Sequence, residues 1–135
     1  MAKTQASIHV GRRKEAVARV ILTPISTGKP VEIVINGKPI EIFFANGIHR
    51  EDLIRPLKST GQYGNYSVSA NVVGGGTSGQ AGAVRLGIAR ALVAINDEFR
   101  TVLRKDDLMT RDPRMVKRKK YGQPKARKRF QFSKR

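Results

Sequence analysis

The sequence predicts a small α+β domain that is followed by an extended basic tail. Runs of β-branched residues occupy the first part of the chain, the apolar period becomes helical from Ser78 on, and all apolar periodicity ends near Thr110. We therefore expect a two-layer fold in which helices cover a small, mostly antiparallel or mixed sheet. The chain divides accordingly into a globular domain over residues 1–110 and a tail over residues 111–135.

The strands are predicted by β-branched runs that are bounded by turn residues. Residues 6–11 and 16–24 should form two strands joined by a charged turn, and residues 66–73 should form another. The segment VEIVINGKPIEIFF, residues 31–44, predicts a hairpin, because its central Asn-Gly pair supplies the positive φ angles of a tight turn. We assign this turn an architectural role only.

A short helix is expected over residues 47–58. Pro56 must lie near its end or kink it, because proline cannot donate a backbone hydrogen bond. The side chains expected to face inward are Ile48, Leu53, Ile54 and Leu57.

A longer helix should begin at Ser78, and a further helical piece is expected over residues 97–108. Arg85 and Arg90 lie mostly outside the apolar stripe of the longer helix. That stripe consists of Val84, Ile88, Ala91, Leu92 and Ile95.

The charge of the chain points to a polyanionic partner. Its 135 residues include 27 Lys and Arg against 10 Asp and Glu, a net charge of +17. Residues 111–135 hold twelve of these cations and one carboxylate. Such an excess destabilises a compact state by self-repulsion, which RNA, DNA or an anionic membrane would offset. Tyr121, Phe130 and Phe132 are interleaved with the cations, and this favours a nucleic-acid-binding arm, because aromatic rings stack on bases while cations neutralise phosphates.

A second group of cations should form a basic surface on the folded domain. Arg12, Arg13, Lys14 and Arg19 are expected to cluster at one end or face of the first hairpin. Together with the helix face that carries Arg85 and Arg90, they should select a nucleic-acid site by its shape, while residues 111–129 supply general affinity.

The glycine-rich segment raises the alternative of a nucleotide-binding enzyme. Gly74, Gly76 and Gly79 have the G-x-G-x-x-G spacing between a strand-like and a helix-like run. The dinucleotide fingerprint also needs a strand after the helix, and no strand-like run follows here. The G-K-[ST] ending of a P-loop is also absent, because Gly79 is followed by Gln80 and Ala81. The hydrolase motif G-x-S-x-G fails as well, since Gln80 stands at its last position. The glycines can instead bring backbone N–H groups at a helix N-terminus close to an RNA phosphate.

Several other function classes are excluded or disfavoured by composition. The chain has no cysteine, which excludes disulfides and thiolate metal sites, and its two histidines, His9 and His49, are far from each other in sequence. We expect no metal and no cofactor. The N-terminus lacks the apolar region of a secretory signal, so a cytoplasmic protein is expected. A binder of anionic membrane surfaces stays an alternative, although the tail has no amphipathic stripe.

Three segments resemble the ribosomal protein S nine family of the small subunit, of the bacterial and organellar type. They are GRRKEAVARV, GGGTSGQAGAVRLGIARAL and the tail RDPRMVKRKKYGQPKARKRFQFSKR with its terminal SKR. The resemblance covers nearly the whole chain in order. It implies a left-handed βαβ crossover, similar to the second domain of ribosomal protein S five, and a place on ribosomal RNA among neighbouring proteins of the head of the small subunit, in a cytoplasmic or an organellar ribosome. It also implies a tail that threads through RNA to the anticodon stem-loop of P-site tRNA, and no enzymatic activity.

The resemblance assigns roles to individual positions. The contact with P-site tRNA falls on Lys134 and Arg135, with Ser133 and Arg129 close behind. Two terminal cations can touch phosphates without reading bases, so every tRNA would be accepted alike. The residues expected to bind ribosomal RNA are Arg12, Arg13, Lys14, Arg19, Gly75, Gly76, Thr77, Ser78, Gly79, Gln80, Arg85, Arg90, Arg111, Arg114, Lys117, Arg118, Lys119, Lys120, Tyr121, Lys125, Arg127 and Lys128.

Overall fold

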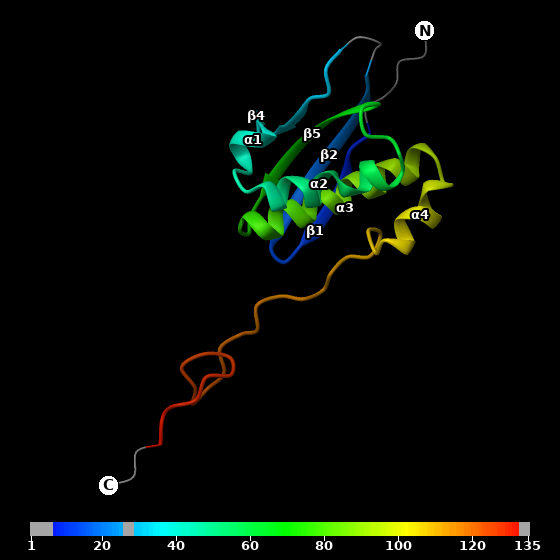
Figure 1. Cartoon of the computed structure of the whole chain (residues 1–135). Helices are drawn as coiled ribbons and strands as arrows, with labels where there is room; N and C mark the ends of the chain where they lie inside the picture. The colour runs from blue at the N-terminus through cyan, green and yellow to red at the C-terminus, as the bar shows by residue number, and fades with distance from the viewer. Residues whose placement is uncertain (1–6, 26–28, 133–135) are drawn as a thin grey trace.

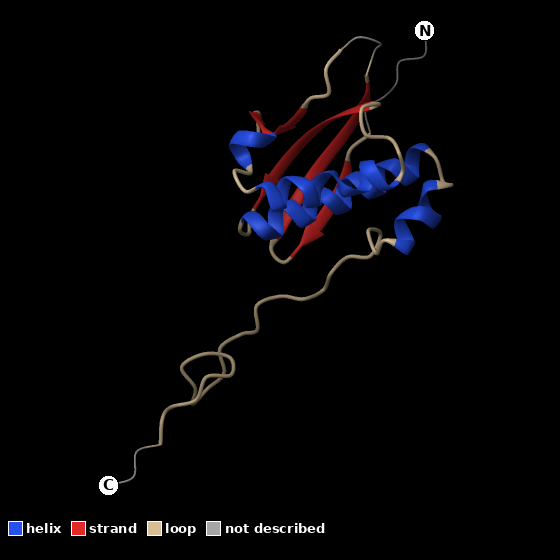
Figure 2. Cartoon of the chain, in the orientation of Figure 1, coloured by secondary structure: helices blue, strands red, loops and turns tan. Residues whose placement is uncertain are grey.

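The computed structural model describes residues 7–25 and 29–132. Five strands form one sheet, and the helices lie on one side of it (Figures 1 and 2). In chain order the elements are β1 (His9–Arg13), β2 (Ala16–Pro24), β3 (Ile33–Ile35), β4 (Lys38–Pro39), α1 (Ile40–Phe43), α2 (Gly47–Ser59), β5 (Tyr66–Val73), α3 (Thr77–Ile95) and α4 (Phe99–Lys105).

The sheet has the strand order β1-β2-β5-β3-β4. Neighbouring strands are antiparallel except for β3 and β5, which are parallel. A parallel pair needs a crossover connection, and here α1 and α2 lie within it. The expected mixed, mostly antiparallel sheet is confirmed, while the hand of the crossover stays a prediction.

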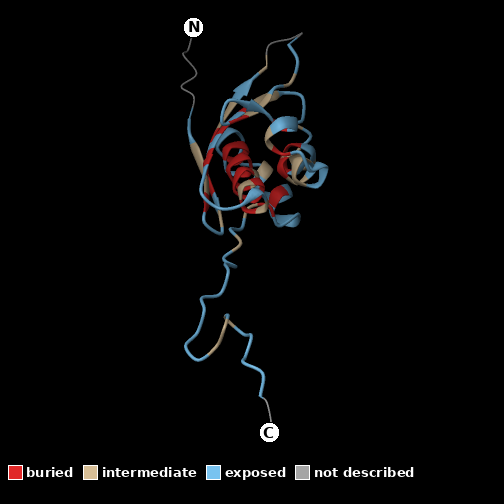
Figure 3. Cartoon of the chain, turned by 90° about the vertical axis from the view of Figure 1, so that its left-hand side faces the viewer, coloured by how far each residue is buried: buried red, intermediate tan, exposed pale blue. Residues whose placement is uncertain are grey.

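The two central strands bury one face and expose the other. On β2 and β5, Ala18 and Val20 pair with Val72 and Ala70, and all four are buried beneath the helices. The side chains between them point to the opposite, open face, because successive residues of a strand alternate. Figure 3 shows the buried residues concentrated between the sheet and the helices. Within residues 7–25 and 29–132, the sheet is therefore covered on one side only.

Helix α3 is buried around most of its circumference, because it packs against β1, β2 and β5 and also against α2. Its predicted start at Ser78 is confirmed to within one residue, while Ile95, which the apolar stripe included, is 48% exposed. Small residues allow the close approach to the sheet. A Cβ atom on Gly11 would overlap the Ala83 carbonyl oxygen and the Gly87 nitrogen, and one on Gly87 would lie 2.6 Å from Val20 Cγ2.

The Asn-Gly turn that follows β3 is confirmed. Asn36 and Gly37 have φ angles of 52° and 79°. The Asn36 side chain also continues the pairing of β3 with β5: its Oδ1 accepts a hydrogen bond from the Val72 N–H at 2.7 Å, and its Nδ2 donates to the Val72 carbonyl at 3.0 Å. The turn thus joins β3 to β4 and also holds β3 against β5.

The second strand of this hairpin is much shorter than predicted. β4 ends at Pro39, and the chain turns directly into α1. Ile40 and Phe44 lie one helical turn apart, and both are buried, so the segment buries its apolar side chains with a helical rather than a strand period. The expectation of a strand over this run is wrong.

Helix α2 follows the prediction except at its first turn. Leu53 and Leu57 are buried and Ile54 packs against the core, with Pro56 inside the helix, three residues before its end. Ile48 is 74% exposed, so its expected inward orientation is wrong. The turn of the helix, about 100° per residue, places Ile48 about 140° from Leu53.

The folded domain ends shortly after α4. Leu108 is buried and Met109 packs against the core, and Figure 1 shows the chain then running away from the domain. Residues 111–132 contain no helix or strand. None of the helices in the described ranges is long and apolar enough to span a bilayer.

Candidate nucleic-acid interface

The glycine segment packs against the turn between β1 and β2. Gly74 and Gly75 have φ angles of 75° and 66°, and a Cβ atom on Gly74 would lie 2.6 Å from the Glu15 carbonyl oxygen. The positive φ angles and this close approach explain why glycine is needed at both positions. The segment therefore has a structural role whatever it binds.

The N-terminus of α3 is open to an anion. Gly76 is the N-cap residue and offers no side chain to the first N–H groups, and the first turn contains no acidic residue. Thr77, Ser78 and Gly79 form this turn, and the Gln80 side chain donates to the Gly74 carbonyl at 3.2 Å. Unpaired N–H groups and the helix dipole favour a negative charge at this position.

The geometry after α3 does not continue as a dinucleotide-binding unit. In the part of the chain that the structure describes, no strand follows α3, and α4 comes next. Asp97, at the spacing of the ribose-binding carboxylate, pairs with Arg100 at 3.4 Å, three residues further on. The acidic match is therefore coincidental.

The start of the tail lies against the same turn of the domain. Arg13 and Lys14 line a hollow of about 350 Å³ together with Asp112, Arg114, Met115 and Val116. Three segments that are far apart in the sequence, the first turn, the glycine loop and the start of the tail, thus meet at one end of the domain. Sequence reasoning missed the part played by Asp112, whose only signal is that it is the single carboxylate of a cationic segment.

The four cations of the first hairpin do not form one cluster, contrary to expectation. Arg12 pairs with Val17, and Arg19 pairs with Val10, so both arginines lie on the open face of the sheet. Arg13 points to the opposite side, toward α3, where its Nη1 donates to the Ser78 carbonyl at 3.5 Å. Alternation along β1 separates the two neighbouring arginines.

Arg85 and Arg90 do not share a face either. Arg85 Nη1 lies 2.7 Å from Asp52 Oδ1, and its side chain is only 21% exposed, so it connects α3 to α2. Arg90 lies on another side of α3 and donates to the Val10 carbonyl of β1 at 2.7 Å. Their contacts within the fold assign both residues a structural role, while RNA binding by either stays a prediction.

The tail presents its charges and aromatic rings to solvent. Tyr121, Phe130 and Phe132 are 97%, 71% and 87% exposed. Ser133, Lys134 and Arg135 lie outside the described residues. The remaining predicted tail cations are all exposed, namely Arg111, Arg114, Lys117, Arg118, Lys119, Lys120, Lys125, Arg127, Lys128 and Arg129.

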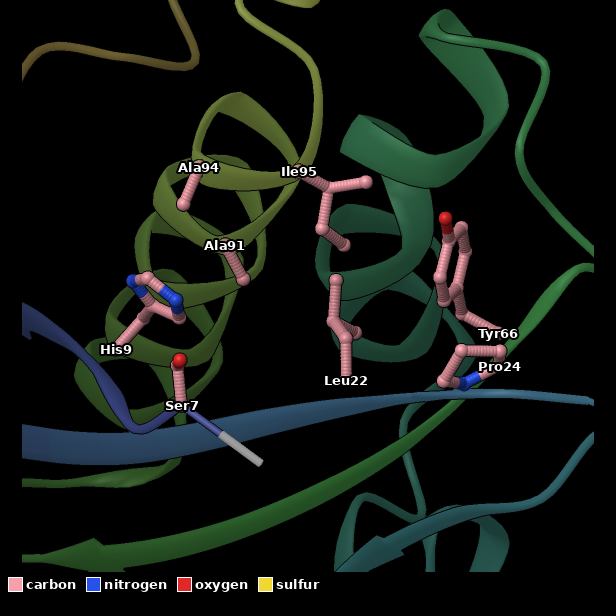
Figure 4. A pocket seen from close by; sticks show the side chains of 8 residues that line it. All are labelled: Ser7, His9, Leu22, Pro24, Tyr66, Ala91, Ala94 and Ile95. Atoms are coloured by element: carbon pink, nitrogen blue, oxygen red, sulfur yellow. The ribbon is translucent and has the colours of Figure 1, made fainter. Parts of the chain in front are cut away.

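A separate hollow of about 220 Å³ lies at the other end of α3. Its lining is mostly apolar, and its polar side chains are Ser7, His9 and Tyr66. Figure 4 shows His9 and Tyr66 at opposite ends of the hollow, with Leu22 in the region between them.

Comparisons with known proteins identify the family. A profile of the family described as Ribosomal protein S9/S16 matches residues 11–135. Three proteins named "Small ribosomal subunit protein uS9" are similar to the chain. The one from Anaeromyxobacter sp. (strain K) is 56% identical over 97% of this chain and 98% of its own length. Those from Cytophaga hutchinsonii and Chlorobium phaeobacteroides are 54% and 52% identical, each over 93% of this chain and 95% of its own length. Proteins of this family are structural rather than enzymatic. The chain therefore belongs to the ribosomal protein S9/S16 family and is a structural protein of the small ribosomal subunit.

Proposed function

We propose that the chain binds small-subunit ribosomal RNA in the head of the subunit, with its tail threading between RNA segments. The observation that carries this proposal is the tail, which holds twelve cations and one carboxylate and exposes its three aromatic rings. A segment that packs so little of its own surface gains order from a partner, and a polyanion with stacking bases complements both its charges and its rings.

The folded domain selects the RNA site, and the tail adds general affinity. The end of the domain where the first turn, the glycine loop and the start of the tail meet is cationic, and it suits the recognition of RNA shape. Arg12 and Arg19 supply cations on the open face of the sheet. Neighbouring proteins of the head would complete the surroundings.

Binding of the full chain to small-subunit ribosomal RNA and to an unrelated RNA of equal length tests this function. We expect tighter binding to ribosomal RNA, and a salt dependence that reports several phosphate contacts. Equal affinity for the two RNAs over the whole salt series would contradict site selection by the chain alone.

The end of the tail contacts the anticodon stem-loop of P-site tRNA through Lys134 and Arg135, with Arg129 and Ser133 behind them. Deleting Lys134 and Arg135 should weaken tRNA binding to the P site about tenfold, because two exposed charge contacts contribute about 0.5–1 kcal/mol each. Assembly of the subunit should be largely intact.

The measurement is the dissociation constant of tRNA on purified subunits at physiological salt. An exchange of the two cations, Lys134→Arg with Arg135→Lys, is the matched control and should keep the affinity, because phosphate contacts need the charge at that position. Unchanged tRNA affinity in the deletion variant would show that the end of the tail does not contact P-site tRNA.

We also propose the hand of the crossover, which follows from the family resemblance. The crossover from β3 through α1 and α2 to β5 is left-handed, as in the second domain of ribosomal protein S five. This hand is rare in proteins, since parallel crossovers are right-handed in about 98% of cases.

A further inference from the structure

We propose that Arg13, Lys14 and Arg114 form a binding site for one phosphate group of the RNA backbone, at the point where the tail leaves the folded domain. The site rests on the proposed function, because it assumes an RNA ligand. It is the hollow of about 350 Å³ whose lining also includes Asp112, Met115 and Val116. Its two walls come from the first turn and from the tail, almost 100 positions apart in sequence.

Among the described residues, Arg13 and Lys14 have no carboxylate partner in an ion pair. Asp112 is engaged by Arg114, whose Nη2 donates to Oδ2 at 2.7 Å and whose backbone N–H donates to Oδ1 at 3.0 Å. These hydrogen bonds lower the pKa of the Asp112 carboxyl far below its usual range, and the nearby charge of Arg13 adds to the effect. The one carboxylate is thus ionised at neutral pH and faces three cations, so the hollow stays positively charged.

Arg13 is held in place with most of its hydrogen-bonding capacity unused. Its side chain crosses α3 at Gly82, where a Cβ atom would overlap Arg13 Cδ and lie 2.8 Å from Nη1. The Nε atom is enclosed and has no hydrogen-bond partner among the described residues, and Nη1 makes only the long bond to the Ser78 carbonyl, 3.5 Å. Gly82 is thus a positioning residue, and the guanidinium keeps N–H donors that an acceptor in the hollow can satisfy.

The chemistry of the hollow matches a phosphate better than a base. The Arg13 guanidinium can match the oxygens of a phosphate in a fixed fork. Lys14 adds a point charge, and Arg114, whose Nε and Nη2 donate to Asp112, adds charge rather than a free fork. The lining contains no aromatic ring on which a base could stack. Because the site joins the domain to the tail, a bound phosphate would also fix the direction in which the tail departs.

The test is the salt dependence of binding of the full chain to small-subunit ribosomal RNA. Arg13→Gln should lower the magnitude of the slope of log K against log salt by about 0.7–0.9, the value for one phosphate contact. Arg55→Gln is the matched control, since it removes the same charge from an exposed position of α2 and should leave the slope unchanged. Gly82→Ala keeps every charge and should weaken binding in the same direction as Arg13→Gln, provided that thermal unfolding shows a folded domain. If this variant does not fold, Arg13→Gln alone decides.

RNA with single methylphosphonate linkages separates one contact from general charge attraction. One neutral linkage should weaken binding by the unaltered chain but not by Arg13→Gln. Equal losses in both proteins at every linkage would overturn the site. The proposed function would still stand if the unaltered chain preferred ribosomal RNA. No preference in the unaltered chain would overturn both. Displacement of RNA by inorganic phosphate beyond that by chloride at equal ionic strength would assign the hollow to free phosphate and overturn the RNA assignment.

Discussion

Replacing Gly11 with alanine should lower the free energy of unfolding by about 3 kcal/mol, the upper part of the range for overpacked cores. Gly11 lies on β1, directly beneath α3, and the added methyl group would overlap the Ala83 carbonyl oxygen and the Gly87 nitrogen. Both are backbone atoms of a helix that is packed on the sheet and on α2, so they can move only by lifting the helix. Urea unfolding followed by circular dichroism measures the effect.

The control for this change is Gly47→Ala. Gly47 is the first residue of α2, and a Cβ atom there would meet only Arg50 Nη2, at an ordinary contact distance of 3.5 Å. Alanine is favoured over glycine in helices by up to about 1 kcal/mol, so this variant should be neutral or slightly stabilised. A loss below about 1 kcal/mol for Gly11→Ala would mean that α3 approaches the sheet less closely than described.

Ending the chain at Thr110 should remove most of the salt dependence of RNA binding and little of the preference for ribosomal RNA. The truncation takes away twelve cations and one carboxylate. Every phosphate that these cations no longer neutralise should lower the magnitude of the salt slope by about 0.7–0.9. The first turn, the glycine loop and the open face of the sheet are retained, so discrimination between RNAs should persist at low salt.

A full-length variant separates charge from stacking. Replacing Tyr121, Phe130 and Phe132 with leucine keeps every cation, so the salt slope should be unchanged. Affinity should still fall, because stacking of a base on an aromatic ring contributes about 1–3 kcal/mol.

If the chain that ends at Thr110 kept the salt slope of the full chain, the assignment of general affinity to the tail would be wrong. If it showed no preference for ribosomal RNA, recognition would have to lie in the tail.

The parts of the fold with a clear period were predictable from sequence. The change to a helical period placed the start of α3 to within one residue, and the Asn-Gly pair placed the turn at Asn36, because these signals depend on neighbours in sequence. The segment from Ile40 to Phe44 was mispredicted because a short apolar run fits either period, and only the core decides between them.

The candidate site was predicted in its composition but not in its arrangement. Strict alternation along β1 already separates Arg12 from Arg13, so that division could have been read from the sequence once the strand was assigned. The contacts of Arg85 and Arg90 could not, because Asp52 and Val10 lie far away along the chain. The meeting of Arg13 with Asp112 depends in the same way on the complete fold.

The two outer strands of the sheet bear on how this chain behaves before it meets a partner. An exposed edge strand is a template for intermolecular pairing and aggregation, and proteins blunt such edges with lysine, proline and short strands. β4 is two residues long and consists of Lys38 and Pro39, while on β1 the Arg90 guanidinium occupies the Val10 carbonyl. Neither edge presents an uninterrupted row of backbone donors and acceptors to a second copy. Both edges are therefore poor templates for the addition of a strand from a second copy of the chain.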